Sequence, residues 1–241
     1  MKVVSWFSAG CTSAVATHLA IKKYGLENVE IIFFETGNHH PDNGRFIKEC
    51  EELFGKKIQI VQNEKYENIY DVFRKQQFIN SPYGAPCTVK LKKDMRLLWE
   101  SNNTWDIQIM GFEAGKREEK RAKRFLKEYP KTNATFPLIE ANMTKEDAVI
   151  YLSDYNIELP VMYKLGYSNN NCIGCVKGGM GYWNKIRVDF PEVFDYMAEL
   201  EREIGASCMS STYLDELDPQ RGYSVKPVVV ECGIFCEENW L

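Results

Sequence analysis

The sequence predicts an α/β fold, a doubly wound parallel sheet followed by a Cys-rich C-terminal region. Short apolar runs alternate with longer helical patterns through the first two thirds of the chain, as strands and crossover helices do. After about residue 160 this alternation gives way to glycines, cysteines and aromatic residues, as in the stretch NNNCIGCVKGGMGYWNK. The 241 residues are enough to bury a full hydrophobic core.

The individual elements follow in chain order. We expect strands at residues 3–7, 29–34, 58–61 and 107–111, and helices at residues 13–24, 42–54, 88–101, 116–127 and 143–155. The last of these helices is opened by the cap residue Thr144. A helix at residues 191–204 and a strand at residues 228–231 complete the prediction. We therefore expect two domains, an α/β domain at 1–160 and a C-terminal region at 161–241 packed on the ligand edge of the sheet.

The net charge and the distribution of apolar residues argue against two classes of protein, broad nucleic-acid binders and membrane proteins. A formal net charge of −4 argues against a broad electrostatic contact with nucleic acid. The basic stretch KREEKRAKRFLK at 116–127 either touches phosphates locally or forms a solvated helix face, because its acids and bases alternate. No run of about 18 apolar residues exists, and MKVVSWF enters a strand pattern directly, so we expect a cytoplasmic protein without a membrane segment.

Two predicted strands end in small and polar residues. The first runs into the turn Ser8-Ala9-Gly10-Cys11-Thr12-Ser13 and then a helix, which is either a cradle for phosphate or sulfate or a tight connection with an N-cap. The second ends in Glu35-Thr36-Gly37, and His39 and His40 follow, where they either face solvent or contact an anion. Because ligands bind at the carboxyl ends of parallel strands, the two strand ends predict a nucleotide crevice.

These segments resemble the PAPS reductase family (phosphoadenosine phosphosulfate reductase-like) of the PP-loop adenine nucleotide alpha hydrolase superfamily. The turn at 8–13 matches the superfamily's SxGxxS turn, and the segments at 35–37 and 41–46 match the family's DTG, P-E-T and R-F pattern. Further matches are Gly111, the Glu118-x-x-Arg121 region, residues 136–139 and 163–167, and Cys172-Ile173-Gly174-Cys175, so that the resemblance spans nearly the whole chain.

The resemblance implies a Rossmann-like (HUP-type) fold whose first domain binds an adenine nucleotide: APS, PAPS or ATP. It assigns nucleotide binding to Ser8, Ala9, Gly10, Thr12, Ser13, Glu35, Thr36, Gly37, Gly111, Glu118 and Arg121. One departure is Thr12, which stands where relatives that cleave ATP usually carry an acidic residue. Nucleotide binding is therefore better supported than ATP cleavage.

Eight cysteines in a chain expected in the cytosol indicate metal or thiol chemistry rather than disulfides. Cys172 and Cys175 have the two-residue gap that lets two sulfurs face one metal, and by itself this gap admits zinc, a redox dithiol or an iron–sulfur centre. Cys87 precedes a predicted helix carrying several lysines, which lowers a thiol pKa. The resemblance to cluster-bearing APS reductases implies a 4Fe-4S cluster on Cys87, Cys172 and Cys175, with zinc as the alternative and metal-free thiols as a third reading.

The C-terminal segment Glu231-Cys232-Gly233-Ile234-Phe235-Cys236 resembles the ECGLH tail of PAPS and APS reductases. The resemblance implies that Cys232 attacks the sulfate sulfur. Phe235 replaces the family's histidine, and Cys236 is available to resolve a mixed intermediate or to ligate the cluster. We expect Cys11, Cys50 and Cys208 to be buried, inert thiols.

We predict the first of three functions and keep the other two as alternatives. The first is reduction of APS or PAPS to sulfite, with a thioredoxin-like reductant as partner. The second is an ATP-dependent sulfurtransferase that adenylates a nucleic-acid base or small molecule, releases pyrophosphate and then thiolates the acceptor. The third is a nucleotide or redox sensor without catalysis. Oligomeric state is open, with a homodimer among the options.

Overall fold

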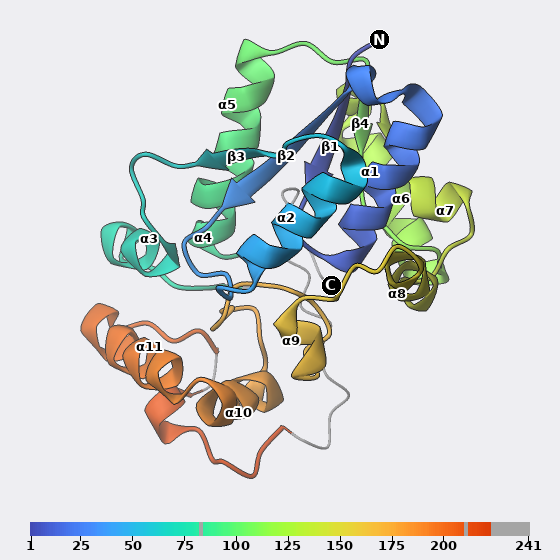
Figure 1. Cartoon of the computed structure of the whole chain (residues 1–241). Helices are drawn as coiled ribbons and strands as arrows, with labels where there is room; N and C mark the ends of the chain where they lie inside the picture. Colours follow the sequence, from blue (N-terminus) through green and yellow to red (C-terminus); the bar gives the residue numbers. More distant parts are fainter. Residues whose placement is uncertain (82–83, 210–211, 223–241) are drawn as a thin grey trace. The chain divides into compact units, whose positions relative to one another are not determined.

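A computed structural model of the chain describes residues 1–81, 84–209 and 212–222 (Figure 1). These residues form two compact units that interleave along the sequence. Unit 1 consists of Met1–Phe34, Pro41–Val61 and Trp99–Leu165, and unit 2 of Glu35–His40, Gln62–Leu98 and the described part of Gly166–Leu241. The sequence prediction placed a single boundary after residue 160, and that division stays a prediction. The predicted strand at 228–231 and both C-terminal cysteines, Cys232 and Cys236, lie outside the described residues.

The strands are β1 (Val3–Phe7), β2 (Val29–Glu35), β3 (Gln59–Gln62), β4 (Ile107–Ile109) and β5 (Ala134–Thr135). The helices are α1 (Cys11–Tyr24), α2 (Asn43–Phe54), α3 (Ile69–Gln76), α4 (Pro86–Thr88), α5 (Asp94–Asn102), α6 (Lys116–Glu128), α7 (Pro137–Glu140), α8 (Lys145–Asp154), α9 (Val161–Lys164), α10 (Met180–Asp189) and α11 (Pro191–Ile204). Short 3-10 turns lie at Leu26–Asn28, Pro130–Thr132 and Leu214–Glu216.

The five strands form one sheet in the order β3-β2-β1-β4-β5. β1 pairs in parallel with β2 on one side and with β4 on the other, and β4 pairs in parallel with β5. The chain therefore builds the sheet outward from β1, first in one direction and then in the other. The strand order reverses between β1 and β4, which makes their carboxyl ends the topological switch point of the sheet.

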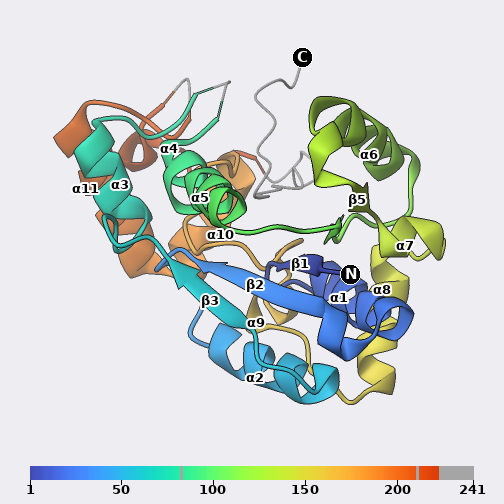
Figure 2. The same ribbon diagram turned by 90° about the horizontal axis from the view of Figure 1, so that it is seen from above.

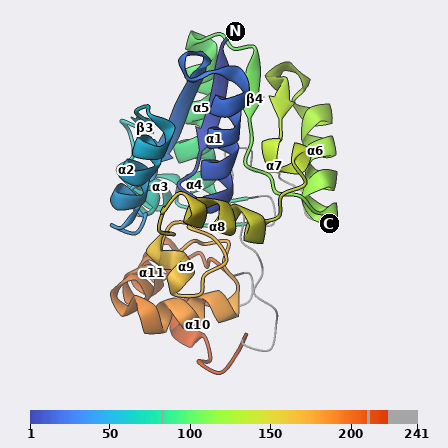
Figure 3. The same cartoon turned by 45° about the vertical axis from the view of Figure 1, so that its right-hand side comes forward.

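Helices cover both faces of this sheet, as predicted for a doubly wound fold. The Phe7 ring of β1 packs 6.4 Å from that of Phe46 and 6.1 Å from that of Phe54, both on α2. The preceding residue, Trp6, points to the opposite face, where its ring lies 5.4 Å from that of Trp99 on α5. α1 and α2 lie together along one face (Figure 2), and α8 packs against α1 (Figure 3).

Unit 2 is built around α3, α10 and α11. The indole of Trp183 on α10 is fully buried and lies 6.4 Å from the Phe194 ring of α11. The Tyr70 ring of α3 lies 4.7 Å from the Tyr196 ring of α11, which joins these two helices. Among the described residues, no helix is both long enough and apolar enough to cross a membrane.

The predicted helix at 88–101 is a composite in the structure. α4 is followed by one π-helical turn, Val89–Lys93, before α5 begins at Asp94. Periodicity also missed α3 and α10. α3 has only eight residues, capped by Asn68, whose side chain accepts the Asp71 amide at 2.9 Å. α10 begins after Gly179 and contains Gly181, in a stretch whose glycines predict loop.

Candidate functional site

The turn between β1 and α1 is organised around the hydroxyl of Ser13. Its Oγ accepts hydrogen bonds from the amides of Ser8 (3.1 Å) and Gly10 (3.3 Å) and from the Ser8 hydroxyl (3.0 Å), and it donates to the Gly10 carbonyl at 2.9 Å. The left-handed backbone angle falls on Ala9, with φ 57°, while Gly10 is extended. The turn therefore presents the first amides of α1 at the carboxyl end of the central strand, the geometry that favours an anion.

Gly111, which follows β4, lies directly against this turn. A Cβ on Gly111 would come within 2.8 Å of the Ser13 Cα and 2.9 Å of the Ser13 amide nitrogen. A side chain does not fit there, so glycine is required for the two strand ends to approach. The contact lies at the switch point between β1 and β4, whereas the sequence alone suggested a crevice between the first two strands.

Two further side chains reach the turn that sequence reasoning did not assign to it. The Cys11 amide donates a hydrogen bond to the Tyr163 hydroxyl at 3.3 Å, and the Lys145 ammonium lies 5.5 Å from the centre of the Tyr163 ring. Burial raises the pKa of the Cys11 thiol. The hydrogen bond to Tyr163 and the charge of Lys145 lower this pKa, but burial has the larger effect. The Cys11 thiol is therefore protonated at neutral pH, in keeping with the inert thiol expected from the sequence.

Glu118 and Arg121 pair with each other on α6. The Arg121 guanidinium lies 3.1 Å from the Glu118 carboxylate, and it stacks 4.1 Å from the centre of the Phe112 ring. Glu118 is buried. Arg121 thus contacts both the Glu118 carboxylate and the Phe112 ring, and the predicted contact of Glu118 and Arg121 with a nucleotide stays a prediction.

In unit 2, the residues after β2 form a turn held by the Glu35 carboxylate. Its Oε1 accepts the amides of Thr36 (2.8 Å) and Gly37 (2.7 Å) and lies 2.9 Å from the His39 Nδ1. Burial by itself raises the pKa of Glu35, but the His39 hydrogen bond and charge and the two amides outweigh it and lower the pKa to about 2. Gly37 has φ 75°, and a Cβ there would lie 2.2 Å from the Glu67 carbonyl oxygen. The glycine, the acid and one of the two histidines thus serve to shape this turn.

The Cys172-x-x-Cys175 segment packs on the same turn. The Cys172 sulfur lies 3.0 Å from the Thr36 hydroxyl, and the Ile173 amide donates to the Asn38 carbonyl at 2.8 Å. The Tyr182 hydroxyl accepts the Cys175 amide at 2.8 Å and donates to the Cys172 carbonyl at 3.3 Å. Both thiols are buried. Thr36, predicted to bind the nucleotide, and Cys172, predicted to bind a metal, are therefore in direct contact.

The third predicted sulfur, Cys87, is half-buried in α4 and belongs to the same unit. Within 1–81, 84–209 and 212–222, however, no three His, Cys, Asp or Glu side chains are grouped so as to hold a metal ion. The described side chains thus do not form a ready site for a cluster, and a 4Fe-4S centre or a zinc ion on Cys87, Cys172 and Cys175 stays a prediction. The other buried cysteines, Cys50 and Cys208, have pKa values raised by burial.

Comparison with known proteins adds to this geometry. The model of the family described as the phosphoadenosine phosphosulfate reductase domain matches residues 2–179. The chain belongs to this family. Family membership confirms the resemblance drawn from the turn at 8–13 and the motifs that follow it. No curated protein matches the chain.

A solved structure similar to this family member is that of the phosphoadenylyl-sulfate (PAPS) reductase from Candida auris in a phosphate complex. The two chains share 14% sequence identity with a TM-score of 0.51, over 71% of this chain and 81% of the other. At this identity the likeness shows the fold alone, and it confirms the predicted Rossmann-like α/β architecture.

Proposed function

We propose that the chain binds an adenylyl sulfate, APS or PAPS, and reduces it to sulfite. One observation carries the proposal: the β1–α1 turn and Gly111 meet at the switch point of the sheet in a member of this reductase family. An open α/β sheet binds its nucleotide at that point, and a helix N-terminus favours the phosphate or sulfate oxygens of the ligand.

The turn suits an anionic ligand. Thr12 adds no negative charge beside the first amides of α1, so the oxygens of a sulfonucleotide meet no carboxylate in the turn itself. The Lys145 ammonium, close to the Tyr163 ring, adds a positive charge on the same side of unit 1. Together these features favour binding of the acidic end of the nucleotide.

We assign the chemical step to Cys232. Its thiolate attacks the sulfate sulfur, forming an S–S bond while the S–O bond to the nucleotide breaks and AMP, or its 3'-phosphate, leaves. A thiol of a thioredoxin-like reductant then attacks the Cys232 sulfur, sulfite departs with the electron pair of the broken S–S bond, and a mixed disulfide remains. A second thiol of the reductant resolves that disulfide and restores the Cys232 thiol. If Cys236 resolves it instead, a Cys232–Cys236 disulfide forms, and a further dithiol of the same reductant class reduces it. The scheme needs reduced thiols, which supports the expected cytoplasmic location.

An anaerobic assay tests the proposal. APS, PAPS and ATP are each offered with a thiol reductant, and sulfite and pyrophosphate are measured. We expect sulfite from one of the two sulfonucleotides, lost in Cys232→Ser and retained in Cys50→Ala, whose thiol is buried in α2.

Other outcomes of the same assay would refute the proposal. Pyrophosphate from ATP, released only with a nucleic-acid or small-molecule acceptor, would instead indicate a sulfurtransferase. Nucleotide binding without either product would indicate a sensor. Iron, sulfide and zinc analysis of the anaerobically purified protein tests separately whether Cys87, Cys172 and Cys175 hold a metal.

A further inference from the structure

Three amides of the β1–α1 turn are already engaged by side chains of the protein. Ser13 Oγ accepts two of them, those of Ser8 and Gly10, and the Tyr163 hydroxyl accepts that of Cys11. The Cys11 amide is the first of α1, and the first amides of a helix are the ones that an anion takes up. A ligand oxygen that binds this amide must therefore replace the Tyr163 hydroxyl.

The hydroxyl also occupies the space above the glycine of the turn. A Cβ on Gly10 would lie 3.3 Å from the Tyr163 oxygen, closer than side-chain carbons ordinarily come. Gly10 thus leaves room for an oxygen atom at this point, and in the structure the Tyr163 oxygen is the one that fills it.

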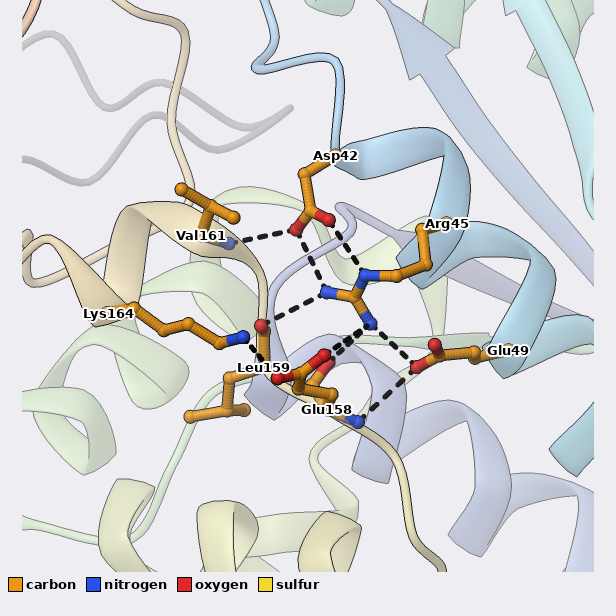
Figure 4. Close-up of polar contacts among 7 residues, drawn as sticks. All are labelled: Asp42, Arg45, Glu49, Glu158, Leu159, Val161 and Lys164. Atoms are coloured by element: carbon orange, nitrogen blue, oxygen red, sulfur yellow. Dashed lines mark hydrogen bonds and ion pairs between the residues drawn. The ribbon is translucent and has the colours of Figure 1, made fainter.

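Tyr163 is held in place by a clamp that joins α2 to the segment before and within α9 (Figure 4). The Arg45 guanidinium forms a two-pronged ion pair with Asp42, at 2.7 and 2.9 Å, and contacts Glu49 at 2.8 Å. The same guanidinium donates to the carbonyls of Glu158 and Leu159, each at 3.1 Å.

The other half of the clamp holds the start of α9. The Asp42 carboxylate accepts the Val161 amide at 2.9 Å, and the Lys164 ammonium contacts Glu158. The Tyr163 amide donates to the Pro160 carbonyl at 3.0 Å. The backbone on both sides of Tyr163 is therefore fixed, so that a rotation of the side chain alone is what moves the hydroxyl away from the Cys11 amide.

We propose that the Tyr163 hydroxyl holds the place of a ligand oxygen on the Cys11 amide in the nucleotide-free protein and is exchanged for that oxygen on binding. The inference rests on the proposed function, since it concerns the same turn, and it makes Tyr163 a residue that sets the affinity of the turn. The protein gives up one hydrogen bond to bind its ligand, and nucleotide affinity is lower by the value of that bond.

The test is Tyr163→Phe, which keeps the ring beside Lys145 and removes only the hydroxyl. Titration calorimetry with inorganic phosphate and with APS should give Kd values about 2- to 10-fold lower than for the wild type, the range expected for the loss of one competing hydrogen bond. The Cys11 amide resonance in 15N NMR spectra should differ between the two free proteins and coincide once phosphate is bound. Tyr155→Phe, which removes a hydroxyl that contacts Lys22 elsewhere in unit 1, should leave both Kd values unchanged.

Equal or higher Kd values for Tyr163→Phe, in a protein with the wild-type melting temperature, would overturn the inference and leave the proposed function intact, because the hydroxyl would then be neutral or would assist the ligand. If the wild type binds neither phosphate nor a sulfonucleotide, the proposed function falls and this inference falls with it.

Discussion

Replacing His18 should make the stability of the protein less sensitive to acid. The imidazole is 7% exposed, its Nδ1 lies 3.2 Å from the Tyr151 hydroxyl, and its ring packs edge-on against that of Tyr155. Burial, aided by the charge of Lys22, lowers the pKa of His18 from 6.5 to about 4. The folded protein therefore keeps this histidine neutral at pH values at which the unfolded chain protonates it.

The direction and the size of the effect on the free energy of unfolding follow from this pKa shift. Since the folded-state pKa is lowered, the contribution of His18 to the free energy of unfolding is complete above pH 6.5 and is lost as the pH falls towards 4. One pKa unit corresponds to about 1.4 kcal/mol, so the loss between pH 7 and pH 5 amounts to about 2 kcal/mol. Because the His18 side chain is almost fully buried, solvent screens little of this energy.

Urea denaturation of the wild type and of His18→Phe at pH 7, 6 and 5, followed by circular dichroism, measures this loss. We expect the stability difference between the two proteins to change by about 2 kcal/mol over the range, to the relative advantage of the variant at pH 5. Tyr151→Phe is the matched control, because it removes the same hydrogen bond and keeps the imidazole. A difference that stays constant with pH would refute the reasoning.

Two further predictions concern the turn and its clamp. Gly111→Ala should cost about 1–3 kcal/mol of stability and weaken sulfonucleotide binding, because its Cβ meets Ser13 at 2.8 Å. Gly44→Ala, with open space around its Cβ in α2, should leave binding unchanged, and equal effects of the two variants in calorimetry would contradict the close approach. Arg45→Lys should cost about 1–3 kcal/mol in urea denaturation, because a lysine cannot keep the two-pronged contact with Asp42 and both carbonyl contacts. Arg202→Lys, which changes an exposed ion pair, should cost less than about 1 kcal/mol, and an equal loss in both would argue against the clamp.

Much of the fold was predictable because its signals are local. The bounds of β1 and α11 agree with the prediction, and α2 shows the expected spacing, with Phe46, Cys50 and Phe54 buried one turn apart. The predicted cap of α8 is also confirmed, since the Thr144 hydroxyl accepts the Asp147 amide at 3.2 Å. Short elements such as α3 and β5 carry too few residues for periodicity to mark them.

The sequence by itself determined the fold class of this protein and the place of its β1–α1 turn, because a strand, a small-residue turn and a helix follow one another within a dozen residues. Only the tertiary structure decided which distant residues meet there. Gly111 lies against Ser13 because β4 pairs with β1, and Tyr163 reaches Cys11 because Arg45 and Asp42 hold the segment before it. Contacts between residues this far apart in the sequence depend on how the elements pack, and no local pattern of residue types encodes them.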